Sequence, residues 1–391
     1  MAKISPKQLK YLLFSHFPAF GPAAWRKIRQ YFSNLENFWE AEETDWLKSG
    51  LSPEHLKNFL TFRKKFLEEE FSNLSVILET EAISFLDYDN PDYPRLLKEI
   101  DSPPALLYYQ GNLSALDKIG LAIVGSRRIS PYAPKVLRAL LPDLLIYNIA
   151  TVSGLALGVD SLAHELSLAA GRPTIAVLGS GLDRASFYPP ANRSLRQNIL
   201  DQGGLLLSEF PPRTPPRRQN FPQRNRLIAG LSQATLVVEA APKSGALITA
   251  AYALDFNREV LAIPGALDNL NSQGPNRLIQ QGARTILNSL DLLEALKIET
   301  GVKKNKPGHR GKTLLNQAGA NLIPIVEFAS ENEKIIYQII AQAETEGSRS
   351  INPDEIVLRS SLDTSSVNST LSIMEIKKLI KNDRGVYQLN H

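Results

Sequence analysis

Cysteine is absent from this chain of 391 residues, which excludes disulfide bonds and thiolate metal sites. Long apolar runs are absent too, since none reaches the roughly 18 residues that a membrane-spanning helix needs. The first residues, MAKISPKQLKYLLF, lack the uninterrupted apolar region and the small-residue cleavage site of a signal peptide. Together these absences predict a cytoplasmic protein with no membrane contact.

Several motifs of nucleotide-binding and hydrolytic proteins are missing as well. The dinucleotide fingerprint G-x-G-x-x-G is absent, because the first candidate loop has only Gly125. The phosphate-binding motif G-x-x-x-x-G-K-[ST] is absent, although Lys243-Ser244 imitates its end. Neither H-E-x-x-H nor G-x-S-x-G occurs. These absences argue against NAD or ATP as a ligand and against catalytic sites of those types.

Acidic residues are missing from two basic stretches. Between Phe210 and Val238 there are five arginines and no aspartate or glutamate. Between Thr300 and Val326 there are again five basic side chains and no acidic one. With a formal net charge of +4, this distribution favours acidic partners. Each stretch taken alone fits a solvated loop equally well.

The apolar spacing divides the chain into four parts. Residues 1–80 read as short helices, a small N-terminal domain of the SAM or helix-hairpin-helix kind. Its segment 17–22 resembles a helix-hairpin-helix turn with Ala19 in place of the usual first glycine, and a plain helical packing module is the alternative. Residues 299–326 read as a basic linker. Residues 327–391 show three helical stretches, a turn and a short strand, which predicts a winged-helix domain.

Residues 81–298 alternate short apolar strands with helical stretches. The spacing between strands is about 25 to 30 residues, the length of a strand–helix–strand unit. Runs such as Ile175–Leu178 are apolar on both faces, as buried parallel strands are. The pattern predicts a doubly wound, Rossmann-like, mostly parallel α/β sheet with helices on both sides. The predicted strands are Leu121–Val124, Ala150–Ser153, Thr174–Leu178, Gly204–Leu207, Thr235–Glu239 and Glu259–Ile263.

The loops after these strands share a composition suited to anions. Ligands of open α/β sheets bind beyond the carboxyl ends of the strands. Glycine allows close backbone approach, helix N-termini offer unpaired N–H groups, and Ser, Arg, Lys and Asn donate to phosphate. The sequence therefore predicts an anion site at this rim. The loops are Gly125–Arg128, Gly154–Asp160, Gly179–Asp183 with Tyr188–Arg193, Ala240–Gly245 and Pro264–Gly265.

Candidate catalytic groups are few in this domain. Asp160 and His164 lie four residues apart with Ser161 between them in sequence. Ser161 does not stand beside His164 as a nucleophile must stand beside its base. We expect instead that Asp160 caps its helix and that His164 is hydrogen-bonded and partly buried.

Two glutamates follow strands, where catalytic carboxylates are often found. These are Glu209 and Glu239, and no further carboxylate clusters with them in the sequence. The alternative for Glu239 is that it orients Arg226 or Lys243.

The segment Arg217–Arg226 interleaves arginines with an aromatic and an amide side chain. It contains Phe221 and Asn225, and a proline-rich approach leads into a helix that begins near Pro222. Proteins that bind single strands combine a positive groove with aromatic platforms, because every base has a π-face. The segment fits that use, and the alternative is that Phe221 packs under the loop while the arginines are solvated.

Residues 86–287 resemble, in order and almost without interruption, the DNA-processing protein A family, also called DprA or Smf. Two upstream segments, Asp89–Leu97 and Pro103–Asn112, fit the lead-in of that family. The stretches that carry the resemblance are Ala122–Arg127, Ser153–Asp160 with Ala163-His164, Leu178–Asp183 with Tyr188-Pro189, Ser208–Phe210, Phe221–Leu231, Val238–Ala240, Ser244–Ala250, Ile263–Gly265, Ser272–Gly274, Asn276, Leu278-Ile279 and Gly282-Ala283.

The resemblance implies an extended Rossmann fold that binds single-stranded DNA. It implies that the protein protects incoming strands and delivers them to a RecA-type recombinase, as in natural transformation. It also implies a homodimer that catalyses no reaction and uses no metal or nucleotide cofactor. A single-strand-binding protein is a further candidate partner.

Carried over position by position, the resemblance implies the DNA-contact residues. Ser126 and Arg127 are expected on phosphates, while Gly179 and Gly181 are expected to admit backbone or base. Many members have a lysine where this chain has Pro190, and Arg193 is the nearest substitute. The full expected set is Gly125, Ser126, Arg127, Arg128, Gly179, Gly181, Arg193, Phe221, Arg224, Asn225, Arg226, Lys243, Ser244 and Gly245.

Two alternatives remain open at this point. Nucleotide phosphoribohydrolases on a related sheet carry P-G-G-x-G-T followed by a glutamate, but the matching segment here, Lys243–Thr249, has no glutamate in the next turn. A regulator of duplex DNA would act through the winged helix. Its predicted recognition helix, Ser365–Ile380, has only Lys377 and Lys378 as cations, late in the helix, whereas base contacts usually come from early positions. A protein-docking role for this module is the alternative.

Overall fold

The computed structural model describes residues 4–17, 20–298, 330–345, 350–360, 362–376, 379–383 and 385–389. Its contacts divide the chain into two units, residues 1–300 and residues 301–391. The predicted basic linker, 299–326, lies outside the described residues, as do Lys377 and Lys378. None of the described helices is long and apolar enough to cross a membrane.

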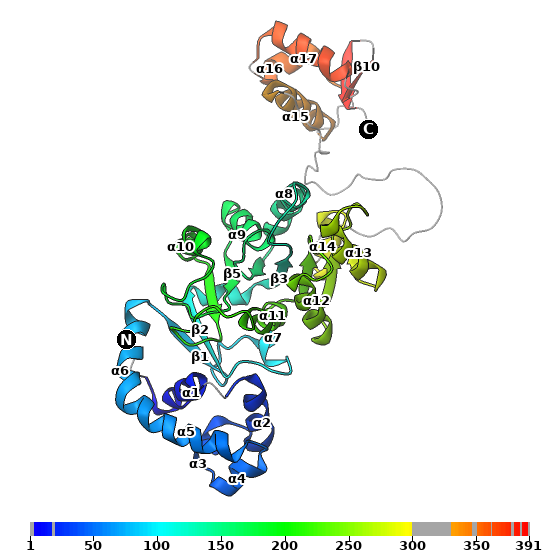
Figure 1. Cartoon of the computed structure of the whole chain (residues 1–391). Coiled ribbons are helices and arrows are strands. Elements are labelled where there is room, and N and C mark those ends of the chain that lie inside the picture. Colours follow the sequence, from blue (N-terminus) through cyan, green and yellow to red (C-terminus); the bar gives the residue numbers. More distant parts are fainter. Residues whose placement is uncertain are drawn as a thin grey trace. The chain divides into compact units, whose positions relative to one another are not determined.

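Short helices form the N-terminal part of the first unit (Figure 1). Ser5 begins the first of them with a reciprocal capping box, in which Ser5 and Gln8 each accept a backbone N–H of the other. Phe17 and Phe20 lie in the predicted helix-hairpin-helix turn, 17–22, and are both buried, with ring centroids 4.8 Å apart. Positions 18 and 19 of that turn lie outside the described residues. The helices are α1 (Pro6–His16), α2 (Pro22–Phe32), α3 (Leu35–Glu40), α4 (Glu43–Lys48), α5 (Pro53–Lys65), η1 (Phe66–Glu70) and α6 (Phe71–Thr80).

These helices share a hydrophobic core with the edge of the sheet. Tyr11 donates its hydroxyl to Asp89 at 2.8 Å, and the hydroxyls of Ser15 and Tyr108 lie 2.8 Å apart. Buried side chains of the helices and of the sheet belong to one apolar cluster. Because apolar burial is the main favourable term in folding, the helical part and the sheet stabilise one another.

A mostly parallel sheet forms the centre of this unit. In the described part of the chain it has nine strands in the order β1-β2-β6-β5-β4-β3-β7-β8-β9. All neighbours pair in parallel except β1 with β2 and β2 with β6, which are antiparallel. The strands are β1 (Ser84–Asp87), β2 (Leu106–Gly111), β3 (Ile119–Val124), β4 (Ile149–Ser153), β5 (Thr174–Val177), β6 (Leu205–Ser208), β7 (Ala234–Val237), β8 (Glu259–Ala262) and β9 (Arg284–Thr285).

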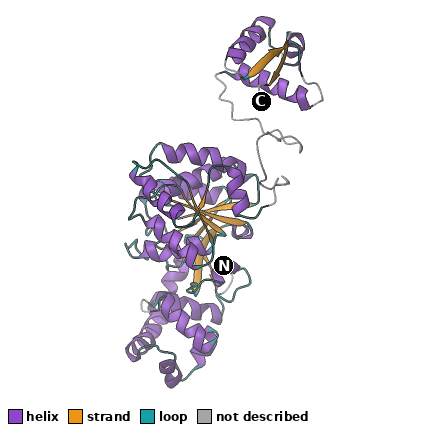
Figure 2. Cartoon of the chain, turned by 90° about the vertical axis from the view of Figure 1, so that its right-hand side faces the viewer, coloured by secondary structure: helices purple, strands orange, loops and turns teal. Residues whose placement is uncertain are grey.

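Helices cover both faces of the sheet, as Figure 2 shows. Side chains alternate along β3, where Leu121 and Ile123 pack toward α8, α9 and α14 while Ala122 and Val124 pack toward α7, α11 and α12. Such alternation follows from the two-residue period of a strand. The helices are α7 (Arg95–Lys98), η2 (Leu113–Asp117), α8 (Tyr132–Leu145), α9 (Val159–Ala169), η3 (Pro190–Asn192), α10 (Arg193–Asp201), α11 (Asn220–Gly230), α12 (Gly245–Asp255), η4 (Leu270–Ser272), α13 (Gln273–Gln280) and α14 (Ser289–Ala295).

The sheet confirms the predicted doubly wound α/β class. All six predicted strands are present, with ends that differ by one or two residues. Sequence reasoning missed β1, β2 and the short β9. β1 and β2 lie before the region of regular strand–helix alternation and pair antiparallel, so the spacing that revealed the other strands gave no signal for them.

The second unit is a helical bundle closed by a hairpin. Its described elements are α15 (Glu331–Thr345), α16 (Pro353–Ser360), α17 (Thr364–Ile376), β10 (Ile380–Asp383) and β11 (Val386–Leu389). The two strands pair antiparallel around Gly385, whose φ of +88° suits glycine. Ile336, Ile340 and Leu371 are fully buried in its core. The order of three helices and a β-hairpin confirms the predicted winged-helix arrangement.

Candidate nucleic-acid interface

The loop after β3 is held tightly between its neighbours. The Ser126 N–H donates to the Glu239 carbonyl at 2.6 Å, and the Ser126 carbonyl accepts the Val159 N–H at 3.1 Å. Gly158 has a φ of +85°, and a Cβ there would lie 2.2 Å from the Ser126 oxygen. Only glycine fits that position without moving the backbone. A Cβ on Gly125 would likewise strike Val159.

Glu239 fixes the remainder of the same loop. Its carboxylate accepts the Ser130 N–H at 3.0 Å and the Ser130 hydroxyl, while Asn271 donates to the Arg128 carbonyl at 3.0 Å. The sequence-based hypothesis that Glu239 orients Arg226 or Lys243 is therefore wrong. Glu239 is 1% exposed and acts on the backbone of the β3 loop, which leaves the side chains of Arg127 and Arg128 exposed.

Arg127 lies over an aromatic pair at the carboxyl end of the sheet. Its guanidinium carbon is 5.4 Å from the centroid of the Phe221 ring, within the range of a cation–π contact. The Tyr188 ring lies 5.9 Å from Phe221, and Tyr188 is 43% exposed. A cavity of about 30 Å³ opens between them. It is lined by Arg127, Gly154, Ala156, Leu157, Tyr188, Pro189, Phe221 and Arg224.

Arg224 is a buried cation at this cavity. It is only 3% exposed and donates to the carbonyls of Gly154, at 2.9 Å, and Val177. The pKa of Arg224 is lowered to about 10, mainly by burial; Asp160 opposes the shift, and the charge of Arg127 adds to it. Burial also raises the pKa of Asp160, against the effect of Arg224 and of two backbone N–H groups. Arg224 thus adds a second positive charge to the cavity lining beside Arg127, which Asp160 offsets in part, and this lining favours an anion.

Arg226 was expected to contact DNA, and the structure shows that this expectation is wrong. Its side chain is 5% exposed and forms an ion pair with the Glu209 side chain, which is 6% exposed. Burial raises the pKa of Glu209, although Arg226 opposes the shift. Arg226 does not line the cavity beneath Arg127. A buried charge needs a partner, so Arg226 and Glu209 join α11 to the end of β6 rather than facing solvent.

The two glycines after β5 also differ from expectation. A Cβ on Gly179 would lie 2.9 Å from Cδ1 of Phe221, and a Cβ on Gly181 would lie 2.8 Å from the Pro211 carbonyl oxygen. Both glycines are buried. The sequence-based interpretation expected both glycines to admit the backbone or a base of DNA. In the structure they instead allow close packing of protein against protein and are not open to a DNA strand.

The remaining expected residues lie outside this cavity. Asn225 donates to the Gly245 carbonyl at 3.1 Å, Ser244 caps α12 by accepting the Ala246 N–H at 3.3 Å, and Lys243 is exposed. Arg193 lines a different cavity beside α10. The structure thus brings together Arg127, Phe221 and Arg224, to which it adds Tyr188 and the loop after β4. The Tyr-Pro pair was visible in sequence, but its closeness to Phe221 depends on the fold.

The Asp160–His164 pair has structural partners. Asp160 accepts the Gly154 N–H at 3.0 Å and therefore fixes the loop before its own helix rather than capping α9. His164 is 0% exposed, so the expectation of partial burial is wrong, and its Nδ1 lies 2.8 Å from the Thr174 hydroxyl. Burial, with Arg224 nearby, lowers the pKa of His164 to about 3. Among the described side chains, no group of three or more His, Asp or Glu is suited to holding a metal ion.

The fold and this rim define an α/β protein with a cationic and aromatic site at the carboxyl ends of its strands. Residues 84–297 match the family model for DNA recombination-mediator protein A. The Smf protein of Synechocystis is 36% identical over 403 residues, which cover 97% of this chain and 98% of that protein. The Bacillus subtilis DNA processing protein DprA is 37% identical over 248 residues, covering 62% of this chain and 82% of that protein. The chain therefore belongs to the DNA recombination-mediator protein A family, which confirms the resemblance.

Solved structures agree with this assignment. DprA from Streptococcus pneumoniae has a TM-score of 0.63 at 34% identity, covering 75% of this chain and 98% of its own. The protein from Helicobacter pylori has a TM-score of 0.50 at 32% identity, covering 55% of this chain and 95% of its own, and its structure is described as showing a single-stranded DNA binding mode.

Proposed function

We propose that this chain binds single-stranded DNA at the cavity beneath Arg127 and delivers the strand to a RecA-type recombinase, without catalysing a reaction. The observation that carries the proposal is that Arg127 lies over the Phe221 ring, with Tyr188 tilted beside it, at a cavity that the buried Arg224 also lines. Two positive charges attract a phosphate, and the exposed face of Tyr188 offers a platform for a base. The family to which the chain belongs is named for recombination mediation, which supports the second half of the proposal.

The preference for a single strand follows from the aromatic side chains. In a duplex the bases are already stacked on one another, so a base reaches an aromatic platform only after it leaves the stack. A single strand meets no such barrier. We therefore expect sequence-independent binding with strong salt dependence, because phosphate contacts dominate such complexes.

The proposed absence of catalysis is supported by the structural contacts that each candidate catalytic side chain makes. Asp160 and His164 are buried and bonded to neighbouring protein atoms, Glu209 pairs with Arg226, and Glu239 holds the β3 loop. A general acid or base must reach the proton that it transfers. None of these four groups lines the cavity beneath Arg127.

Partner proteins and self-association complete the proposal. The family likeness supports a homodimer and a further contact with a single-strand-binding protein. Leu267 and Leu270, between β8 and α13, are 86% and 59% exposed, and exposed apolar side chains favour an interface. The molar mass in solution, measured by light scattering, tests the dimer.

The test is fluorescence anisotropy of a labelled thymine oligonucleotide, single-stranded and duplex, with wild type and Arg127→Ala. Arg138 on α8 is exposed and lines neither cavity, so Arg138→Ala is the matched control. We expect wild type to prefer the single strand strongly. We expect Arg127→Ala to bind it with an affinity about ten- to a hundredfold lower, which corresponds to the free energy of one hydrogen bond to a charged group. Equal binding of both DNA forms, unchanged by Arg127→Ala, would place the DNA site elsewhere.

A further inference from the structure

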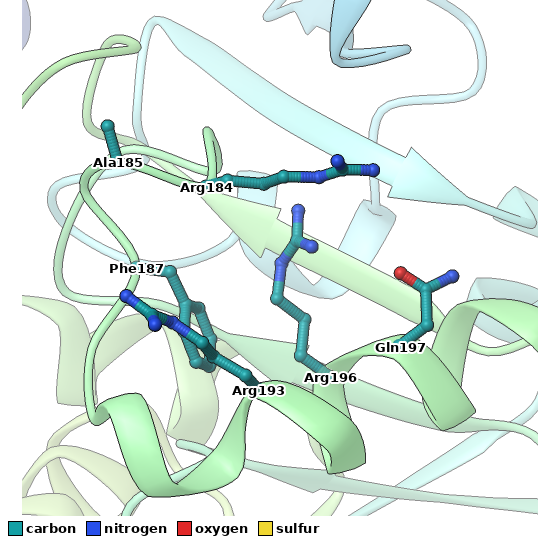
Figure 3. Close-up of a pocket in the computed structure, with 6 residues that line it drawn as sticks. All are labelled: Arg184, Ala185, Phe187, Arg193, Arg196 and Gln197. Atoms are coloured by element: carbon teal, nitrogen blue, oxygen red, sulfur yellow. The ribbon is translucent and has the colours of Figure 1, made fainter.

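A second, larger cavity lies beside the first turns of α10 (Figure 3). Its volume is about 450 Å³, within the usual range for a bound small molecule or a part of a polymer. It is lined by Arg184, Ala185, Phe187, Arg193, Arg196 and Gln197. Three of these six side chains carry a positive charge and none carries a negative one, so the lining favours an anion.

Arg196 forms the buried part of this lining. It is 5% exposed, and its Nη2 donates to Gln110 Oε1 at 2.8 Å and to the Leu182 carbonyl at 3.0 Å. Its Nε is buried and has no hydrogen-bond partner among the described residues. The guanidinium also lies 5.6 Å from the centroid of the Phe187 ring. A buried donor without a partner is unfavourable, and an acceptor from a ligand would satisfy it.

The positive charges of the cavity are only partly neutralised by protein. Figure 3 shows the guanidinium of Arg196 pointing toward that of Arg184, and the charge of Arg184 is among the causes that lower the pKa of Arg196, after burial. Glu81 approaches Arg184 at 3.6 Å, but the Arg184 side chain is 77% exposed. Asp183 is occupied by the N–H groups of Ser186, at 3.0 Å, and Arg213, at 2.6 Å. Neither carboxylate lines the cavity.

We propose that this cavity binds a backbone phosphate of the same DNA strand, beyond the part of the strand held at Arg127. The inference rests on the proposed function. One loop contributes to both cavities, since Phe187 lines this one while Tyr188 and Pro189 line the other. A strand that leaves Tyr188 meets the arginines of α10 next. The DNA path is therefore longer than the site beneath Arg127 and continues along α10.

The cavity is tested with two variants that change its charge in opposite directions. Arg184→Gln removes an exposed charge, and Gln197→Lys adds one to an exposed position. The matched controls are Arg138→Gln on α8 and Gln233→Lys, an exposed residue directly before β7 and thus at the opposite end of the sheet. Opposite effects of the two variants exclude misfolding as the explanation, because misfolding only weakens binding.

Binding is measured by anisotropy with thymine oligonucleotides of about 4 and about 20 nucleotides, lengths that bracket common single-strand site sizes. For the longer oligonucleotide we expect Arg184→Gln to bind roughly three- to fivefold more weakly and Gln197→Lys to bind more tightly, with the controls unchanged. In Arg184→Gln the logarithm of the binding constant depends less steeply on the logarithm of the salt concentration. The magnitude of this slope is smaller by about 0.7, the value for one phosphate contact on a single strand. The shorter oligonucleotide, held at Arg127, responds to neither variant.

Two results would overturn this inference. Unchanged binding of the longer oligonucleotide in both variants would show that the strand does not reach the cavity. If thymidine monophosphate, followed by ligand-observed NMR, loses binding in Arg184→Gln while oligonucleotide affinity does not change, the cavity takes a free nucleotide instead. In either case a loss of binding in Arg127→Ala keeps the proposed function intact, so the two failures are distinguishable.

Discussion

Acidification from pH 7 to 5 is expected to destabilise the protein through His164. His164 is fully buried, and its pKa lies at about 3 in the folded protein against about 6.5 in an unfolded chain. Between these two values the unfolded state binds the proton more tightly than the folded state. The stability that the neutral, buried His164 contributes is therefore fully present above about pH 6.5 and is lost as the pH falls toward 3.

The size of the effect follows from the same pair of values. Each pH unit inside the window lowers the free energy of unfolding by about 1.4 kcal/mol per group. At pH 5 the titration of His164 has thus lowered the free energy of unfolding by about 2 kcal/mol relative to pH 7. His16, whose pKa burial lowers to about 4, acts in the same direction. Burial raises the pKa values of Asp160 and Glu209, so these two carboxyls oppose the histidines by binding protons more tightly in the folded state.

A comparison of two proteins isolates the histidine from the opposing carboxyls. Urea unfolding, followed by circular dichroism between pH 7 and 5, is measured for wild type and for His164→Asn. The amide of asparagine keeps a hydrogen-bonding atom toward Thr174 but does not titrate. We expect the slope of unfolding free energy against pH to be smaller in the variant by about 1.4 kcal/mol per pH unit.

His164→Asn leaves a smaller side chain in the core, so its stability at pH 7 is lower whatever the histidine titration does. The slope, rather than the absolute stability, is the quantity that decides. Identical slopes in the two proteins would refute the reasoning, because they would mean that His164 binds a proton as tightly in the folded state as in the unfolded state.

Two further substitutions test the contacts around the site. Glu209→Gln is expected to lower the free energy of unfolding by about 3–5 kcal/mol because it leaves Arg226 buried without its counter-charge. Asp45, whose side chain is 41% exposed in its pair with Lys48, is changed to Asn as the control and costs less than about 1 kcal/mol; similar small losses in both would contradict burial of the Arg226–Glu209 pair. Gly179→Ala is expected to displace the Phe221 ring, which lies 2.9 Å from the added Cβ, and to weaken single-strand binding by up to the ~1–3 kcal/mol of one stacked base. Unchanged anisotropy titrations of a folded Gly179→Ala protein would remove Phe221 from the DNA site.

Several parts of the site were predictable from residues close together in the chain. The run Ile175–Leu178 is apolar on both faces, and such a run predicts a buried parallel strand whatever surrounds it. The carboxyl ends of parallel strands share one edge of the sheet, so the loops that carry Arg127 and Tyr188 were expected at a common rim.

Other parts depended on residues far apart in the chain. Arg224 and Arg226 stand two positions apart in a stretch without acidic residues, and by composition both resemble solvated groove cations. Arg224 instead donates to carbonyls 70 and 47 residues away, and Arg226 pairs with Glu209. Likewise nothing local indicates that Tyr11 bonds to Asp89, which ties the N-terminal helices to the sheet.

The sequence by itself determined the α/β class, most of the strands, the rim at which a ligand site is expected and the family. These depend on short-range periodicity and on residue types at fixed spacing. Only the tertiary structure decided which arginines face the cavity, which are consumed in buried pairs, and that Glu239 holds the β3 loop. The reason is physical: whether a charged side chain is solvated or buried depends on the partners that the fold brings to it, and those partners lie on other strands and helices.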